Sequence, residues 1–177
     1  AFLELLSFYE VALRNAILLS VRRIHRYSIF DSRFIQSLPE KRRNDLLEVI
    51  NTISGERFEY AHNKPLRIDP NQVNENAVIA KLNFHFWESL LSKSYASRYL
   101  EHHYRTSFPN AKSARQIKQI HRTTKDIRDL RNRVCHNEPI FKKKNLKRLY
   151  LKALVILKWI DKEYAAFVLE NTARLRE

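Results

Sequence analysis

Apolar residues recur at three- and four-residue steps along most of this chain, which is the spacing of helices that bury one face. The pattern predicts helices over 2–28, 40–54, 74–82, 95–104, 116–135 and 146–168. Within 83–92, Phe84, Trp87, Leu90 and Leu91 also have helical spacing. That spacing favours a place in the core, with stacking on unpaired bases as the alternative. We therefore expect an all-α protein.

The predicted helix over 116–135 ends beside the most distinctive residues of the chain. Its apolar stripe continues to Val134. Pro139 disfavours helical geometry at the residue before it, so the helix should stop near Asn137. His136 then lies in the last turn, where the helix dipole favours the imidazolium form that a proton donor needs.

Three of the connections between the predicted helices have distinctive sequences. Residues 31–39 form the first, anchored by Phe30 and Phe34, and residues 56–71, with two prolines and no clear period, form a long surface loop. A basic connection over 142–148 leads into the last helix. The regular apolar spacing of that helix makes it the expected antiparallel partner of the helix before it.

The first predicted helix is apolar on most sides, which places it at the centre of a bundle. Its polar residues include Glu10, Arg14 and Asn15. Polar side chains on a mostly buried helix need partners. Glu10 and Arg14, four residues apart, either pair with each other or support Arg131 and His136 on a neighbouring helix.

Length and composition favour one globular domain over the range 1–177. Apolar residues make up 44% of the chain, and one Gly with five Pro suits a helix-rich protein. The apolar stretch 2–21 is interrupted by charged residues, so we expect a buried helix and no membrane association. The chain starts at Ala1 and contains no Met, so we expect the encoded N-terminus to be missing.

The formal net charge of +14 is concentrated in one part of the chain. From Lys112 to Lys152, fourteen Lys or Arg residues stand against three acidic residues, which accounts for +11 of the +14. A polyanion is the expected partner of such a surface, and nucleic acid is the commonest one. The alternative is a solvated basic face without a specific partner.

The single cysteine, Cys135, excludes an internal disulfide and fits a reducing cytosol. A thiolate beside His136 would be a nucleophile, but adjacent residues on a helix point to different sides, so a small buried residue is the expected role. Seven His and one Cys offer no repeated metal-ligand spacing, and His102 with His103 should form an exposed polar pair. We expect neither a metal nor a cofactor.

Arg131, Asn132 and His136 form a candidate catalytic set. Asn132 and His136 share a helix face, whereas Arg131 and His136 diverge by roughly 140°. A long Arg could reach the same phosphate, or the helix could pack against its own copy across a two-fold axis. RNA can be cut without a metal when an imidazole moves a proton and a guanidinium holds the charged phosphate. The alternative is a chance arrangement on a basic helix.

Three segments of the chain together resemble a known family. They are Glu10-Val-Ala-Leu-Arg-Asn-Ala-Ile17, Leu82-Asn-Phe-His-Phe-Trp-Glu-Ser-Leu-Leu91 with Phe108-Pro109, and Ile127-Arg-Asp-Leu-Arg-Asn-Arg-Val-Cys-His-Asn-Glu-Pro-Ile140. In order and spacing, across nearly the whole chain, they resemble the short Abi-like (abortive infection) proteins of bacteria, within the HEPN superfamily.

The resemblance implies an HEPN-like helical bundle with a four-helix core and additional short helices, dimerising through the helix that carries the motif. It also implies a metal-independent ribonuclease site where the Arg-polar-three-residues-His motifs of two subunits meet. Carried over by position, the site would consist of the catalytic Arg131, Asn132 and His136 and the supporting Glu138, Glu10 and Arg14.

Some positions depart from the family pattern. The family usually has Ala-His-His-Glu-Pro where this chain has Cys-His-Asn-Glu-Pro from Cys135 to Pro139, so the motif His is kept and the second His is absent. His85 stands where Gly is common, which should change local packing. Glu138 stands where some HEPN members carry a Tyr that a partner nucleotidyltransferase modifies, so that regulation is not expected.

These features predict a cytoplasmic, dimeric endoribonuclease that cleaves single-stranded or looped RNA in phage defence or as a toxin, neutralised by a protein or small-RNA antitoxin. The 2′-hydroxyl would attack the adjacent phosphate and leave a 2′,3′-cyclic phosphate. RNA would be held by basic residues around the motif, namely Arg128, Arg133, Lys142, Lys143, Lys144, Lys147 and Arg148. The alternatives are a non-catalytic RNA-binding module, acting with a small RNA or protein partner, and an interaction protein whose charge is incidental.

Overall fold

The computed structural model describes residues 2–25, 28–61, 66–97, 100–140 and 145–172, and not the side chain of Phe2. Within these ranges the protein is all-helical, as predicted. In chain order the elements are α1 (Phe2–Ile24), α2 (Ser32–Ser37), α3 (Glu40–Ser54), α4 (Glu75–Lys81), α5 (Phe84–Ser89), α6 (Lys93–Ala96), the 3-10 helix η1 (Glu101–His103), α7 (Tyr104–Ser107), α8 (Gln116–Cys135), α9 (Leu146–Ile160) and α10 (Lys162–Thr172).

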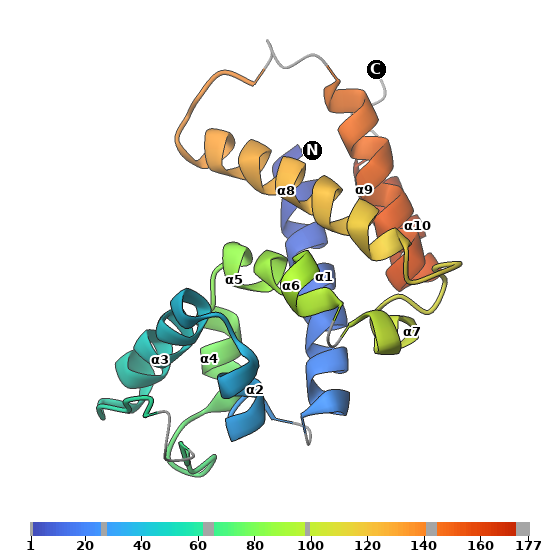
Figure 1. Ribbon diagram of the computed structural model, residues 1–177. Helices are drawn as coiled ribbons and strands as arrows, with labels where there is room; N and C mark the ends of the chain where they lie inside the picture. The colour runs from blue at the N-terminus through green and yellow to red at the C-terminus, as the bar shows by residue number, and fades with distance from the viewer. Residues whose placement is uncertain (1, 26–27, 62–65, 98–99, 141–144, 173–177) are drawn as a thin grey trace.

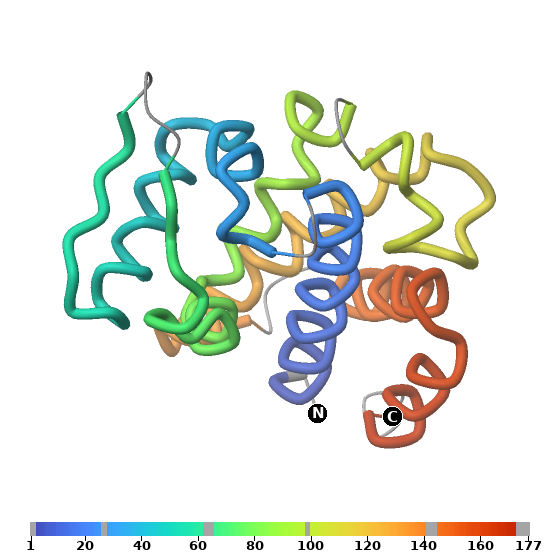
Figure 2. Tube along the Cα trace, turned by 90° about the horizontal axis from the view of Figure 1, so that it is seen from below, coloured from blue at the N-terminus to red at the C-terminus, as the bar shows by residue number. Residues whose placement is uncertain are grey.

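α1 is the central helix, as its sequence predicts. In Figures 1 and 2 it lies between α2–α4 on one side and α9 and α10 on the other, and α8 crosses it. Tyr9 Oη lies 2.8 Å from Thr124 Oγ1 of α8, and both residues are buried. Ser20 Oγ lies 2.6 Å from Ser107 Oγ of α7. These hydrogen bonds satisfy the buried hydroxyls and fix α1 against the helices around it.

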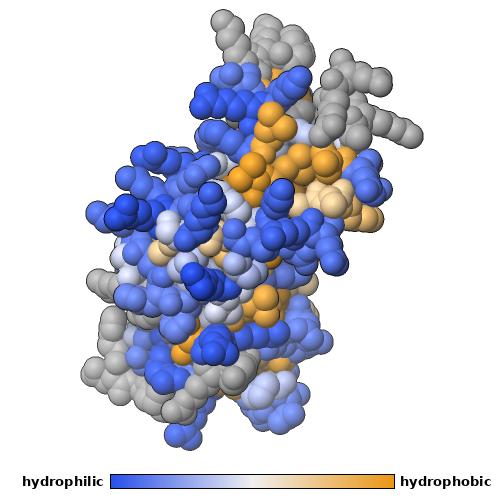
Figure 3. Space-filling model, turned by 90° about the vertical axis from the view of Figure 1, so that its right-hand side faces the viewer, coloured by the Kyte–Doolittle hydropathy of each residue, from blue (hydrophilic) through white to orange (hydrophobic). Residues whose placement is uncertain are grey.

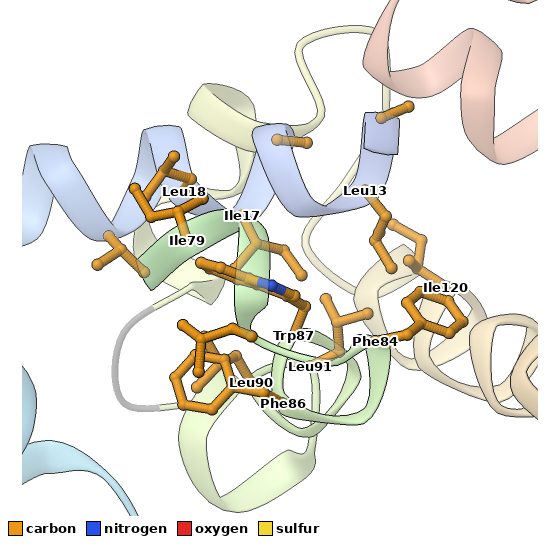
Figure 4. Packing of buried hydrophobic residues seen from close by; sticks show 14 of the residues in the cluster. Leu13, Ile17, Leu18, Ile79, Phe84, Phe86, Trp87, Leu90, Leu91 and Ile120 are labelled. Atoms are coloured by element: carbon orange, nitrogen blue, oxygen red, sulfur yellow. The ribbon is translucent and has the colours of Figure 1, made fainter. Parts of the chain in front are cut away.

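Residues 84–91, which include α5, fill the space between α1 and α8. Figure 4 shows side chains of α1, such as Ile17, meeting those of residues 84–91, with Phe84 close to Ile120 of α8. Trp87 is fully buried and Phe84 is 3% exposed. The predicted core position of these aromatic side chains is therefore correct, and they cannot stack on bases.

The boundaries of α3, α4 and α8 agree with the sequence because their caps are local. Gly55 ends α3 in the left-handed conformation, with φ 73°, which Gly adopts without strain. Asn74 begins α4 by accepting the backbone N–H groups of Asn76 and Ala77. The loop between these two helices contains no helix in its described part.

The predicted last helix is in fact two helices. Asp161 is extended, with φ −151° and ψ 126°, and its carboxylate accepts the backbone N–H groups of Glu163 and Tyr164 at 2.8 and 3.0 Å. This N-cap ends α9 and starts α10 although the apolar spacing continues through the break. α9 packs on α8, the partner predicted for it, and Figure 1 shows the two helices inclined to one another.

Other predicted boundaries were also wrong. α1 ends at Ile24, and the connection over 31–39 contains α2, although Phe30 and Phe34 are buried anchors as predicted. Asp31 starts α2 by accepting the N–H of Arg33 at 2.8 Å. The single helix predicted over 95–104 is replaced by α6, η1 and α7.

The exposed large apolar side chains lie on α1, α9 and α10: Leu3, Val11, Leu19, Leu151, Val155 and Phe167. Figure 3 shows one side of the molecule, hydrophilic over most of its area, with an apolar area in its upper part. Every exposed residue of α8 is polar, charged or Cys. A partner that packs on α8 therefore meets a polar, mainly basic surface.

Candidate active site

An open pocket lies between the start of α5 and the second half of α8. On α8, residues three and four apart are neighbours on one face, which places Arg128, Arg131 and Asn132 together. The pocket has a volume of about 360 Å³ and is lined by these three residues with Asn83, Phe84 and His85. Two of the three predicted catalytic residues, Arg131 and Asn132, therefore share one pocket.

Arg131 reaches the pocket beside a carboxylate of α1. Its side chain is 43% exposed, and its Nε lies 3.8 Å from Oε2 of Glu10. A partly exposed pair at this distance contributes at most about 1 kcal/mol to folding, so its main effect is to orient the guanidinium. Two roles were predicted for Glu10, pairing with Arg14 or supporting Arg131, and the structure shows the contact with Arg131. Arg14 instead donates from Nε to Oδ1 of Asn15 at 3.4 Å.

His136 is exposed and caps α8, but it does not line the pocket of its own chain. Its backbone N–H donates to the carbonyl of Asn132 at 3.0 Å. The two residues are one helical turn apart, so His136 lies about 6 Å further along the axis on the face that carries Asn132. Both Arg131 and His136 reach solvent, and His136 is at the open end of the helix.

The end of α8 is a Schellman motif built on an asparagine. Asn137 has φ 55°, and its N–H donates to the carbonyl of Val134 at 3.1 Å. The N–H of Glu138 donates to the carbonyl of Arg133 at 2.8 Å. These two bonds satisfy the last carbonyls of the helix. The predicted stop near Asn137 is correct, and Asn137 itself makes the turn.

Other predicted site residues lie away from the pocket. Glu138, predicted as a supporting residue, lies with Oε2 3.8 Å from Nε of Arg133, and both side chains are half exposed. Lys147 and Arg148 are exposed in the first turn of α9. Lys142, Lys143 and Lys144 fall outside the described residues. RNA binding by this set stays a prediction.

Cys135 is exposed, which corrects the prediction of a small buried residue. α8 buries one face only, and Cys135 belongs to the open face, whereas Val134 beside it packs against the core. His102 and His103 are exposed, as predicted.

An ionic cluster that sequence reasoning missed lies beside the pocket. Glu88 of α5 is only 3% exposed. Its Oε2 lies 2.8 Å from Nδ1 of His85 and 2.5 Å from Nη1 of Arg128, and its Oε1 lies 3.0 Å from Nε2 of His121. Arg128 also contacts Asp129 at 3.2 Å. The guanidinium of Arg128, predicted to bind RNA, is thus already engaged with two carboxylates.

Glu88 is ionised despite its burial. Burial alone raises the pKa of this carboxyl, but hydrogen bonds from His121 and His85 and the positive charge of Arg128 outweigh it and lower the pKa to about 2. A glutamate within the apolar run from Phe84 to Leu91 was the available signal, because a buried carboxylate requires such partners. His85, expected to alter local packing, instead joins this cluster.

Glu88 should make the stability of the fold depend on pH. Its folded-state pKa of about 2 lies below the ordinary value of 4.5. The ionised carboxylate therefore stabilises the folded protein by on the order of 3 kcal/mol. This stabilisation is fully present above about pH 5 and is lost as the pH falls toward 2. The difference in free energy of unfolding between the wild type and Glu88→Gln should shrink by about half between pH ~6 and pH ~3. Urea unfolding measures it, and an equal difference at both values would contradict the assignment.

A larger pocket, with a volume of about 890 Å³, lies between α3 and residues 57–60. Its two arginines are engaged with neighbours: Arg57 Nε lies 2.7 Å from Glu59 Oε1, and the Arg43 guanidinium lies 3.9 Å from the centre of the Tyr60 ring. No His is among the described residues that line it. The smaller pocket is therefore the candidate site.

In the described ranges, no group of three or more His, Cys, Asp or Glu residues is arranged to hold a metal ion. None of the helices described combines the length and the apolar character required to cross a membrane.

In comparisons with known proteins, no family model, curated protein or solved structure matches this chain.

Proposed function

We propose that this chain is a metal-independent endoribonuclease of the HEPN type, active as a cytoplasmic homodimer in phage defence or as a toxin. One observation carries the proposal: Arg131 and Asn132 line an open pocket that also holds an imidazole, in the most basic part of the chain. Guanidinium, amide and imidazole are the groups that metal-free cleavage of RNA requires.

Arg131 suits the role of phosphate ligand. Its planar guanidinium can donate two parallel hydrogen bonds to a phosphate, and the contact through Nε with Glu10 leaves both terminal nitrogens for the ligand. Asn132 beside it can orient the nucleophile. His136 would donate a proton to the leaving oxygen.

A second copy would complete the site. The face of α8 that carries Asn132 continues to His136 at the open end of the helix, so two copies packed across a two-fold axis would unite two Arg–His sets in one cleft. The bundle would then be the HEPN-like arrangement with a four-helix core, dimerising through α8.

The proposal predicts cleavage in EDTA with defined product ends. The protein should cut single-stranded RNA at internal positions and leave a 2′,3′-cyclic phosphate and a 5′-hydroxyl, with equal rates with and without EDTA. Mass spectrometry of the fragments identifies the ends. Products with 5′-phosphate ends, or cleavage that stops in EDTA, would overturn the proposal.

Cys135 offers a direct test of the dimer, because it is exposed and is the only cysteine in the chain. If the α8 ends meet, a bifunctional thiol reagent spanning about 10 Å, the axis separation of packed helices, should join two subunits. The yield should rise with salt or added RNA, since α8 exposes mainly cations that repel a second copy. Cys135→Ser is the control for specificity, and monomer alone at all salt concentrations would count against the dimer.

A non-catalytic RNA-binding module is the second candidate, favoured by the position of His136 outside the pocket of its own chain. Such a module would bind RNA through the same basic surface, with a small RNA or a protein partner. It would leave the RNA intact in the EDTA experiment, which separates it from the nuclease.

Salt dependence tests the basic surface under either candidate. Replacing Lys147 and Arg148 by Ala should weaken RNA binding and lower the slope of log affinity against log salt by about 2, because each phosphate contact contributes roughly one unit. The double variant Lys158→Ala and Lys162→Ala removes the same charge from exposed positions near the other end of α9. Equal slopes for the two variants, measured by fluorescence anisotropy, would show that Lys147 and Arg148 have no special role.

A further inference from the structure

His85 is oriented by a buried carboxylate. Its Nδ1 lies 2.8 Å from Oε2 of Glu88, and Glu88 is fixed in turn by Arg128 and by His121. A carboxylate that accepts a hydrogen bond from one ring nitrogen selects the tautomer in which that nitrogen carries the proton. The lone pair of His85 is therefore on Nε2, and the ring is available as a base.

Arg128 competes with Glu88 for Nδ1 of His85, because a guanidinium only donates and would form a hydrogen bond to this nitrogen only in the opposite tautomer. Nη1 of Arg128 lies 2.7 Å from Nδ1 of His85, and both nitrogens converge on the same oxygen of Glu88. A deprotonated Nδ1 would place its lone pair against an ionised carboxylate. With Nδ1 protonated, both nitrogens are donors that share Oε2, and the ionised carboxylate, as the stronger acceptor, favours this arrangement despite their close approach.

His85 is one of the residues that line the pocket. His85 lines the pocket with Arg131 and Asn132, and its side chain is 46% exposed. Among the described residues no group is hydrogen-bonded to its Nε2. His121 also binds Glu88, but it does not line the pocket. Of the two imidazoles on this carboxylate, His85 is the one that lines the pocket and is the more exposed, at 46% against 30%.

We infer that His85 is a catalytic residue of the proposed ribonuclease: the base that takes the proton of the attacking 2′-hydroxyl. The inference rests on the proposed function and adds a second imidazole to it. Glu88 acts through His85 as a positioning residue, and His136 keeps the role of acid.

Two imidazoles account for both proton transfers of the reaction. Nε2 of His85 takes the 2′-hydroxyl proton as the 2′-oxygen forms its bond to phosphorus. The bond from phosphorus to the 5′-oxygen breaks, and that oxygen takes a proton from the imidazolium of His136. Arg131 holds the charge on the non-bridging oxygens. The products are a 2′,3′-cyclic phosphate and a 5′-hydroxyl, and the two rings exchange their protons with water.

A substrate with sulfur in place of the 5′-oxygen at the scissile bond separates the two roles. A thiolate leaves without protonation, because a thiol is far more acidic than an alcohol. On ordinary RNA, His85→Ala and His136→Ala should each lower the cleavage rate by about 100-fold or more. On the sulfur substrate, His136→Ala should return to within about tenfold of the wild type, and His85→Ala should stay about 100-fold lower.

Three results would overturn the inference: wild-type cleavage of ordinary RNA by His85→Ala, recovery of His85→Ala on the sulfur substrate, or failure of His136→Ala to recover on it. His102→Ala removes an exposed imidazole of η1 and should cut both substrates at the wild-type rate. Circular dichroism melting confirms that each variant is folded. If the wild type itself cuts neither substrate, the proposed ribonuclease function fails, whereas wild-type cleavage with a fully active His85→Ala removes only the role of His85.

Discussion

The substitution His136→Ala should lower the rate of RNA cleavage by about 10²–10⁴-fold, the range that a positioned acid or base contributes. His136 is exposed at the end of α8, and its side chain has no hydrogen bond or ion pair with the described residues, so its removal should change the melting temperature little. RNA affinity should also be nearly unchanged, because the basic surface is intact. Single-turnover cleavage of a labelled RNA, together with a binding titration, measures both quantities.

The matched control for this variant is His102→Ala, which removes another exposed imidazole from a helical segment. Cleavage at the wild-type rate by a folded His136→Ala protein would show that the motif His has no catalytic role. Loss of binding together with cleavage would instead assign His136 to RNA recognition.

Replacing Glu88 by Ala should produce the largest loss of stability among the substitutions considered. The variant leaves Arg128, His85 and His121 without their common acceptor, in a site where Glu88 is 3% exposed. Breaking a buried charge pair in this way costs about 3–5 kcal/mol. For a chain of this length the melting temperature should fall by roughly 10 °C. Urea and thermal unfolding measure the change.

Glu170→Ala is the control for the Glu88 variant, because it removes an exposed glutamate of α10 and should change the free energy of unfolding by less than about 0.5 kcal/mol. Glu88→Gln keeps a hydrogen-bond acceptor and loses the charge, so its cost should lie between the two. A loss of stability for Glu88→Ala no greater than that for Glu170→Ala would contradict the ionic cluster.

The fold could be predicted from the sequence where a local residue marks the end of a helix. Gly55 and Asn74 act within a few residues of the helices they bound. The break between α9 and α10 was missed because the apolar spacing continues through it, while a single extended residue, Asp161, starts a new helix. The short elements α6, η1 and α7 were predicted as one helix over 95–104, because their residues together have the apolar spacing of a single helix.

The candidate site could be predicted only in part. Of the catalytic set named from the sequence, Arg131 and Asn132 line one pocket, and His136, predicted to share a face with Asn132, lies outside it. Glu10 reaches Arg131 from another helix, which the sequence left as one of two alternatives. The cluster of Glu88, His85 and His121 depends on how α5 packs against α8, and a pattern within one helix does not contain that information.

In the proposed reaction RNA supplies its own nucleophile, the 2′-hydroxyl, so removing that hydroxyl at the scissile position should stop cleavage. The cleavage position of a short RNA is first mapped, and the same RNA is then made with a single 2′-deoxy nucleotide on the 5′ side of that bond. The wild-type protein should no longer cut there, although it should bind the strand as before. Cleavage of the deoxy position at the rate of the all-ribose strand would contradict the proposed reaction.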